Sequence, residues 1–131
     1  AINSGCNNVK LINSDNQTVI TSNITYINNE ITSGNGSTET ITSFTKANLN
    51  VKQYFCDATG GNFTIDFSPT VTINEGKTWS FKKITASNTV TIDASTIGAT
   101  IDGSNTYVLS SNYSYVTIQW TGTEFIITSN N

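Results

Sequence analysis

The stretch Asn62-Phe63-Thr64-Ile65-Asp66-Phe67 shows the pattern that decides the fold class of this chain. Its apolar residues Phe63, Ile65 and Phe67 alternate with polar ones, and side chains two positions apart lie on the same face of an extended strand. A helix would need apolar residues three or four positions apart instead. The stretch therefore predicts a β-strand with one buried face and one polar face.

The same alternation recurs through the rest of the chain. It is found in four further pairs or triplets, Val71 with Ile73, Trp79 with Phe81, Val90 with Ile92, and Val116 with Ile118 and Trp120, and the run at 125–128 predicts a final buried strand. Clusters of Gly, Asn and Ser separate these runs at 60–61, 74–76, 87–88, 102–105, 110–112 and 121–122. Strands about ten residues apart predict an all-β fold, an antiparallel β-sandwich or β-prism of short strands.

The low content of charged residues limits the kinds of partner that the chain can bind. The chain has 131 residues, enough for one core, and only 11% are charged, with six Lys and Arg and a formal charge of −3. Because no basic surface can form, we do not expect nucleic acid binding. No apolar run is long enough to predict a membrane span. The lack of Met and the start at Ala1 favour a piece of a longer protein.

The first fifty residues differ from the rest, so we expect an N-terminal β-rich segment at 1–50, resembling a stalk or connector, and a C-terminal β domain at 51–131. Four isoleucines have the spacing of a coiled coil, Ile20, Ile24, Ile27 and Ile31. The residues between them, mostly Thr, Ser and Asn, favour strands at 18–21 and 23–27 instead. A short helical coil remains the alternative.

The two cysteines leave two interpretations open. Cys6 and Cys56 are fifty positions apart with no second Cys or His at zinc-ligand spacing. A disulfide between them would suit an extracellular protein. The alternative is that Cys56, in the run VKQYFC, is a small buried apolar side chain and that Cys6 is loosely placed.

The chain has no histidine, which excludes Ser-His-Asp triads, Cys-His dyads and histidine metal sites. An enzyme would have to use carboxylates, as glycosidases do. Asp66, Asp93 and Asp102 each follow Thr-Ile, and alternation places each opposite the buried Ile, facing solvent at a strand end. There an Asp accepts N–H groups of the following turn. The sequence thus predicts no catalytic residues, no metal and no cofactor.

Aromatic residues are the candidates for ligand binding, because rings stack on sugars and a Thr, Ser and Asn surface offers hydrogen bonds. Trp79 and Trp120 alternate in phase with core residues, which predicts that both pack in the core. Tyr113 and Tyr115 precede a strand and are expected to be exposed. Tyr113, Tyr115 and Trp120 are the candidate ligand-binding residues.

A succession of short motifs runs from residue 51 to the end of the chain. It comprises GNFTIDF at 61–67, GKT at 76–78 with FKKI at 81–84, NTVTID at 88–93, IDG at 101–103 with YVL at 107–109, YVTIQW at 115–120 and FII at 125–127. This order resembles the C-terminal β-rich domains of viral fibre and spike proteins, such as phage tail or head fibres and appendages of large DNA viruses. One departure is Ser68, which stands where such domains often have Pro directly after the first alternating strand.

The resemblance implies a non-enzymatic homotrimer at the virion surface. Such a protein would attach the virion to a host-cell receptor or glycan, or decorate the capsid, and would contact other virion proteins through its N-terminal side. A cellular carbohydrate-binding or adhesin module is the alternative. A polysaccharide-cleaving enzyme, the third class, would need two carboxylates within about 10 Å of each other.

Overall fold

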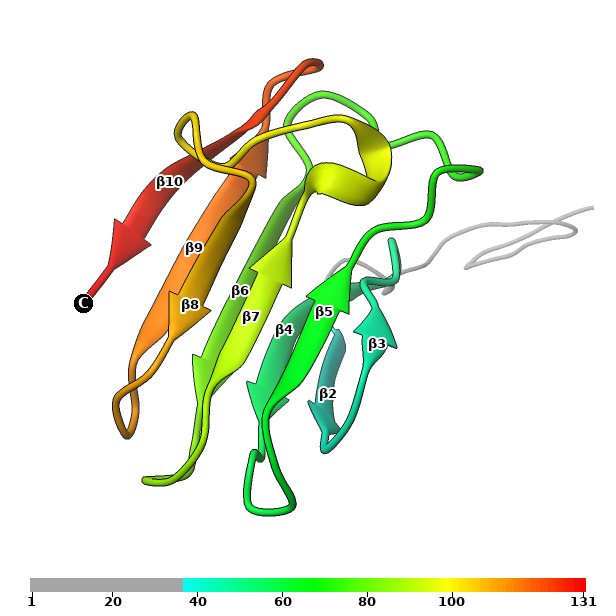
Figure 1. Ribbon diagram of the computed structural model, residues 1–131. Helices are drawn as coiled ribbons and strands as arrows, with labels where there is room; N and C mark the ends of the chain where they lie inside the picture. Colours follow the sequence, from blue (N-terminus) through cyan, green and yellow to red (C-terminus); the bar gives the residue numbers. More distant parts are fainter. Residues whose placement is uncertain (1–36) are drawn as a thin grey trace, which may run out of the picture. The chain divides into compact units, whose positions relative to one another are not determined.

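The computed structural model describes residues 37–131, and this part of the chain is all-β, as predicted (Figure 1). A five-stranded sheet has the order β10 (Phe125–Asn130), β9 (Tyr115–Trp120), β6 (Thr78–Lys83), β4 (Val51–Cys56), β2 (Ser37–Ile41). A four-stranded sheet has the order β3 (Thr45–Lys46), β5 (Phe63–Asp66), β7 (Val90–Asp93), β8 (Thr106–Leu109). A 3₁₀ turn, η3 (Ser95–Ile97), follows β7.

The chain alternates between the two sheets from β2 to β7. Strands β2, β4 and β6 lie parallel in one sheet, and β3, β5 and β7 lie parallel in the other. The chain from residue 37 to residue 93 therefore winds in successive turns, each of which adds one strand to each sheet. Strands β8, β9 and β10 pair antiparallel with their neighbours. The all-β prediction is confirmed, whereas its antiparallel detail holds only for these last pairings. Alternation reports which face of a strand is buried and carries no information on the direction of its partner.

The core fills the space between the sheets. Phe67, Trp79 and Phe125 form an aromatic cluster, with ring centroids 5.2 Å apart for Phe67 and Trp79 and 4.6 Å apart for Phe67 and Phe125. Tyr54 stacks on Phe81 at 5.6 Å. The indole N–H of Trp79 donates to the backbone carbonyl of Asn48 at 3.1 Å. The backbone N–H of Asn48 in turn donates to the hydroxyl of Tyr54 at 2.8 Å. These contacts satisfy the buried polar atoms of both large side chains.

Two of the predicted strands differ in the structure. Val71 and Ile73 belong to no strand, and Val71 is 43% exposed. Their segment follows Pro69 and connects β5 in one sheet to β6 in the other, so it has no neighbouring strand with which to pair. The strand predicted at 125–128 exists as β10, but it is an edge strand in which Phe125 is buried and Ile126 is exposed.

Residues 37–46 contribute β2 and β3, which pair with β4 and β5. The strands expected at 18–21 and 23–27, the alternative helical coil and Cys6 all lie outside the described residues. Cys56 is buried, as the second cysteine interpretation predicts for it, and it forms no disulfide within residues 37–131. Within the described part, no helix has the length and apolar character needed to cross a membrane.

Candidate binding face of the five-stranded sheet

Strict alternation along β6 and β9 gives the five-stranded sheet a polar outer face. In β6, Trp79, Phe81 and Lys83 are buried, so Ser80 and Lys82 point outward. In β9 the outward positions include Tyr115 and Thr117, on either side of buried Val116. The register places Ser80 between Gln53 and Thr117, and Lys82 between Phe55 and Tyr115. A row of amide and hydroxyl groups therefore lies beside a row of aromatic and ammonium groups.

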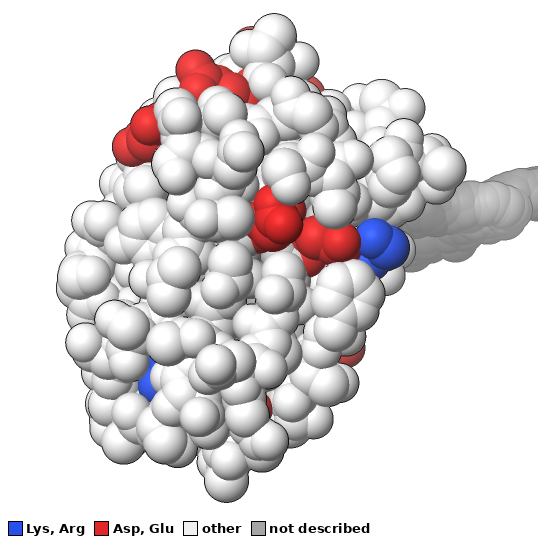
Figure 2. Space-filling view, viewed as in Figure 1, with Lys and Arg blue, Asp and Glu red and all other residues white. Residues whose placement is uncertain are grey.

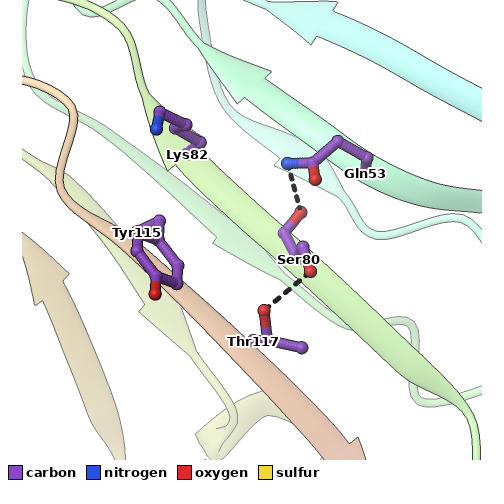
Figure 3. A pocket seen from close by; sticks show the side chains of 5 residues that line it. All are labelled: Gln53, Ser80, Lys82, Tyr115 and Thr117. Carbon is purple, nitrogen blue, oxygen red and sulfur yellow. Dashed lines mark hydrogen bonds between the residues drawn. The ribbon is translucent and has the colours of Figure 1, made fainter. Parts of the chain in front are cut away.

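Five of these side chains line a depression of about 250 Å³, shown in Figure 3: Gln53, Ser80, Lys82, Tyr115 and Thr117. We call it the sheet depression. The hydroxyls of Ser80 and Thr117 share a hydrogen bond of 2.8 Å, and the amide nitrogen of Gln53 donates to the carbonyl of Ser80 at 3.3 Å. These bonds fix the polar row and leave the Gln53 side-chain oxygen without a hydrogen-bond donor among residues 37–131.

Lys82 is held by aromatic rings. Its Nζ lies 5.7 Å from the ring centroids of both Tyr113 and Tyr115, within the range of a cation–π contact. Tyr113 has a φ of +61° in the turn before β9 and is 56% exposed. The hydroxyl of Tyr115 is 3.1 Å from that of Ser129 on β10. The structure thus brings two of the three candidate residues together around one ammonium group.

Trp120, the third candidate, lies elsewhere. Its ring packs 4.7 Å from that of Phe125, so it is attached to the core as the alternation predicts, although it is only half-buried. It lines a separate depression of about 380 Å³ together with residues of the loop before β6, of β9 and the turn that follows it, and of β10: Glu75, Gly76, Gln119, Thr121 and Ile126.

Sequence reasoning missed four residues of the sheet depression, Gln53, Ser80, Lys82 and Thr117. They occupy the polar positions of their strands, and the sequence contains many such positions that look alike. Only the register between strands shows which of them meet. One usable signal was the alternation of Trp79 and Phe81, because its continuation marks Lys82 as an outward-pointing cation on this strand.

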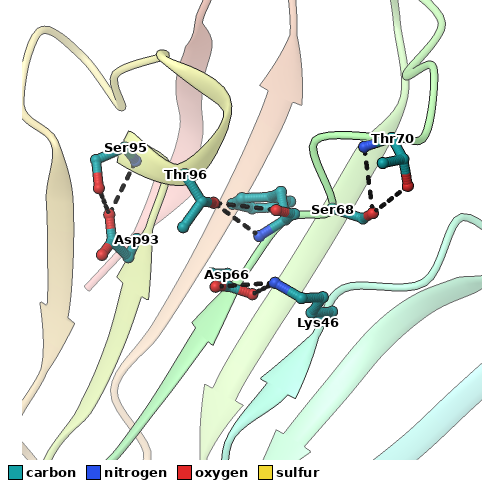
Figure 4. Close-up of polar contacts among 8 residues, drawn as sticks. Lys46, Asp66, Ser68, Thr70, Asp93, Ser95 and Thr96 are labelled. Carbon is teal, nitrogen blue, oxygen red and sulfur yellow. Dashed lines mark hydrogen bonds and ion pairs between the residues drawn. The ribbon is translucent and has the colours of Figure 1, made fainter.

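The three aspartates that follow Thr-Ile have structural partners, and Figure 4 shows those of Asp66 and Asp93. Asp93 accepts from the N–H of Ser95 at 2.8 Å and from its hydroxyl at 2.6 Å, which confirms the predicted Asx turn. Asp102 forms no such bond to its own turn. Its Oδ1 instead accepts the N–H of Ile127 on β10 at 3.0 Å.

Asp66 corrects the prediction that all three carboxylates face solvent. It is only 7% exposed and receives both hydrogen bonds of Lys46, at 3.0 and 3.2 Å (Figure 4). The partner strand β3 brings Lys46 next to the end of β5, a pairing that the sequence pattern did not indicate.

Charge is sparse elsewhere too: uncharged residues cover most of the face in Figure 2, with small acidic and basic patches between them. Among residues 37–131, no three His, Cys, Asp or Glu side chains group in a way that could hold a metal ion.

No protein-family model matches the chain, and no curated protein shows significant similarity to it.

Proposed function

We propose that this chain is a non-enzymatic attachment module that binds a carbohydrate in the sheet depression. The observation that carries the proposal is the composition of that depression, where the ring of Tyr115 lies beside the hydroxyls of Ser80 and Thr117 and the amide of Gln53. A sugar presents an apolar C–H face to an aromatic ring and hydroxyls to such polar groups. The volume of the sheet depression, about 250 Å³, is slightly below that of ordinary drug-sized pockets. This volume suits about one sugar ring.

The setting that we propose is the head of a viral fibre or spike: a homotrimer at the virion surface that binds a host-cell receptor or glycan and joins other virion proteins through its N-terminal side. The motif order at 51–131 supports this setting. Strands β2, β10, β3 and β8 also lie at the edges of their sheets, and neighbouring subunits are one means of covering such edges. A cellular carbohydrate-binding or adhesin module is the alternative.

The non-enzymatic part of the proposal is supported by the structural contacts of the carboxylates. Asp93 holds its own turn, Asp102 binds the edge of β10 and Asp66 pairs with Lys46. Cleavage of any glycan by the purified chain, lost in both Asp93→Asn and Asp102→Asn, would overturn this part.

Binding is tested by screening the purified chain against immobilised glycans and titrating the best one by calorimetry. We expect Tyr115→Ala to weaken binding at least about tenfold, because the stacking surface is removed. Tyr115→Phe keeps the ring and loses only the contact with Ser129, so its affinity should stay close to that of the unaltered chain. Thr91→Ala, on the outer face of the other sheet, is the matched control. Full affinity in Tyr115→Ala would refute the assigned site.

The native mass separates the viral from the cellular setting. Sedimentation equilibrium should give a species close to three times 14.1 kDa for a fibre head. A monomer that still binds glycan would favour the cellular module.

A further inference from the structure

We infer that the recognised sugar carries a carboxylate and that the ammonium group of Lys82 binds it. This inference rests on the proposed glycan binding and specifies the class of ligand. The sheet depression contains one cation, Lys82, and no carboxylate among its lining residues. It therefore has a formal charge of +1 in a chain whose net charge is −3. A local charge opposite to that of the whole chain favours an anionic group at this place.

The contacts of Lys82 leave its hydrogen-bonding capacity for a ligand. Among residues 37–131 its Nζ has no carboxylate within 4 Å and no hydrogen-bond acceptor, and its close neighbours are the rings of Tyr113 and Tyr115. A ring face attracts the ammonium group without accepting conventional N–H···O bonds. The side chain is thus positioned while its three donors stay available.

The other lysines of the described part show the contrast. Lys46 pairs with Asp66, Lys77 donates to the carbonyl of Val51 and Lys83 donates to the carbonyl of Thr85. Lys52 also has no acceptor among residues 37–131, but it is exposed on β4 and does not line the depression. Lys82 is therefore the lysine that combines an available ammonium group with a place in the depression.

The polar row supplies partners for the remainder of the sugar. Ser80 lies two positions before Lys82 on β6, about 7 Å along the strand. One pyranose ring spans this separation, with its carboxylate at Lys82 and its hydroxyls at Ser80 and Thr117, beside the ring of Tyr115. In Figure 3, Lys82 and Tyr115 lie at one end of the depression and the hydroxyl pair lies further along the strands.

Matched pairs of ligands test the inference. The probes are hexuronic acid oligosaccharides of differing stereochemistry, each compared with the same oligosaccharide after its carboxylates have been reduced to alcohols. We expect the best-bound acid form to bind at least about tenfold more tightly than its reduced form. This preference should shrink between 0.05 and 0.5 M salt, at about the range where screening removes exposed charge interactions.

Variants assign the preference to Lys82. Lys82→Gln should bind both forms of the oligosaccharide equally, while Lys82→Arg should retain the preference. Lys52→Gln removes the same charge from β4 outside the depression and should leave the preference unchanged. Circular dichroism and a thermal melt of each variant show that it is folded.

The possible results distinguish the carboxylate preference at Lys82 from glycan binding as such. Equal affinity of the unaltered chain for both members of a bound pair would overturn the inference and leave the proposed glycan binding intact. A preference that persists in Lys82→Gln would likewise overturn the role of Lys82. No binding of either member of any pair would overturn the inference, and the screen of immobilised glycans would then decide the proposed function separately.

Discussion

Cys56 is the last residue of β4, and its side chain is completely buried. Burial disfavours the thiolate and raises the pKa of this thiol to about 12. Because the thiolate is the reactive form, Cys56 should resist alkylation in the folded protein at pH 8 and react quickly once the protein is unfolded. The measurement is the rate of thiol labelling with and without urea in Cys6→Ser, where Cys56 is the only cysteine. Rapid labelling of the folded variant would contradict the prediction.

The same thiol makes stability depend on alkaline pH. Its folded pKa of about 12 lies above the ordinary value of 9.0, so between these pH values the unfolded chain releases a proton that the folded chain retains. The free energy of unfolding should therefore fall as the pH rises through this range, by up to about 1.4 kcal/mol per pH unit. Burial also raises the pKa of Tyr54, which acts in the same direction at higher pH. Burial lowers the pKa of Lys77, which acts in the opposite direction.

Urea unfolding at pH 8, 9, 10 and 11 measures this slope. Cys56→Ala should show a shallower fall than Cys6→Ser, which retains the buried thiol. Parallel curves for the two variants would show that Cys56 contributes nothing to the alkaline loss.

Asp102 joins a tight turn at 101–104 to the edge strand β10. Ile101 and Ser104 exchange two backbone hydrogen bonds, and the φ angles of Asp102 and Gly103 are +48° and +83°, as a two-residue type I′ turn requires. The N–H of Asp102 donates to the carbonyl of Phe125 and its carboxylate accepts from Ile127, both at 3.0 Å. The turn thereby occupies part of the open edge of β10.

Replacing Asp102 tests this role. Asp102→Ala should lower the free energy of unfolding by about 1–2 kcal/mol, because it removes the acceptor and places alanine at a positive φ. Asp102→Asn keeps a side-chain oxygen and tolerates this φ, so it should cost much less. Urea denaturation measures both variants. Equal losses in the two would show that the negative charge matters, and that the acceptor and the backbone conformation do not.

The elements also show what the sequence could predict. Alternation identified β5, β6, β7 and β9, because each has one apolar face against the core, and the apolar run at 125–128 indicated β10. It failed at Val71 and Ile73, since a strand also needs a partner and the segment crosses between the sheets. The exposed Tyr113 could be predicted from its place before a strand. The sheet depression could not, because Gln53, Ser80 and Thr117 are brought together by the register between strands.

The last strand, β10, contributes Phe125 to the core between the two sheets. The ring of Phe125 on β10 lies 4.6 Å from that of Phe67, which follows β5 in the other sheet, and 6.1 Å from that of Trp79 on β6. It also contacts Trp120 on β9. One side chain close to the C-terminus therefore joins both sheets of the described part.

Phe125→Ala should then destabilise the whole of this part by about 3–5 kcal/mol, the usual cost of truncating a buried Phe. Val108→Ala, at a half-exposed position on edge strand β8, should change stability by no more than about 0.5 kcal/mol. Urea unfolding followed both by tryptophan fluorescence and by far-ultraviolet circular dichroism measures both variants. Coincident transitions would show that the sheets unfold together. If Phe125→Ala shifted the fluorescence transition and left the dichroism transition in place, Phe125 would stabilise its own surroundings without joining the two sheets.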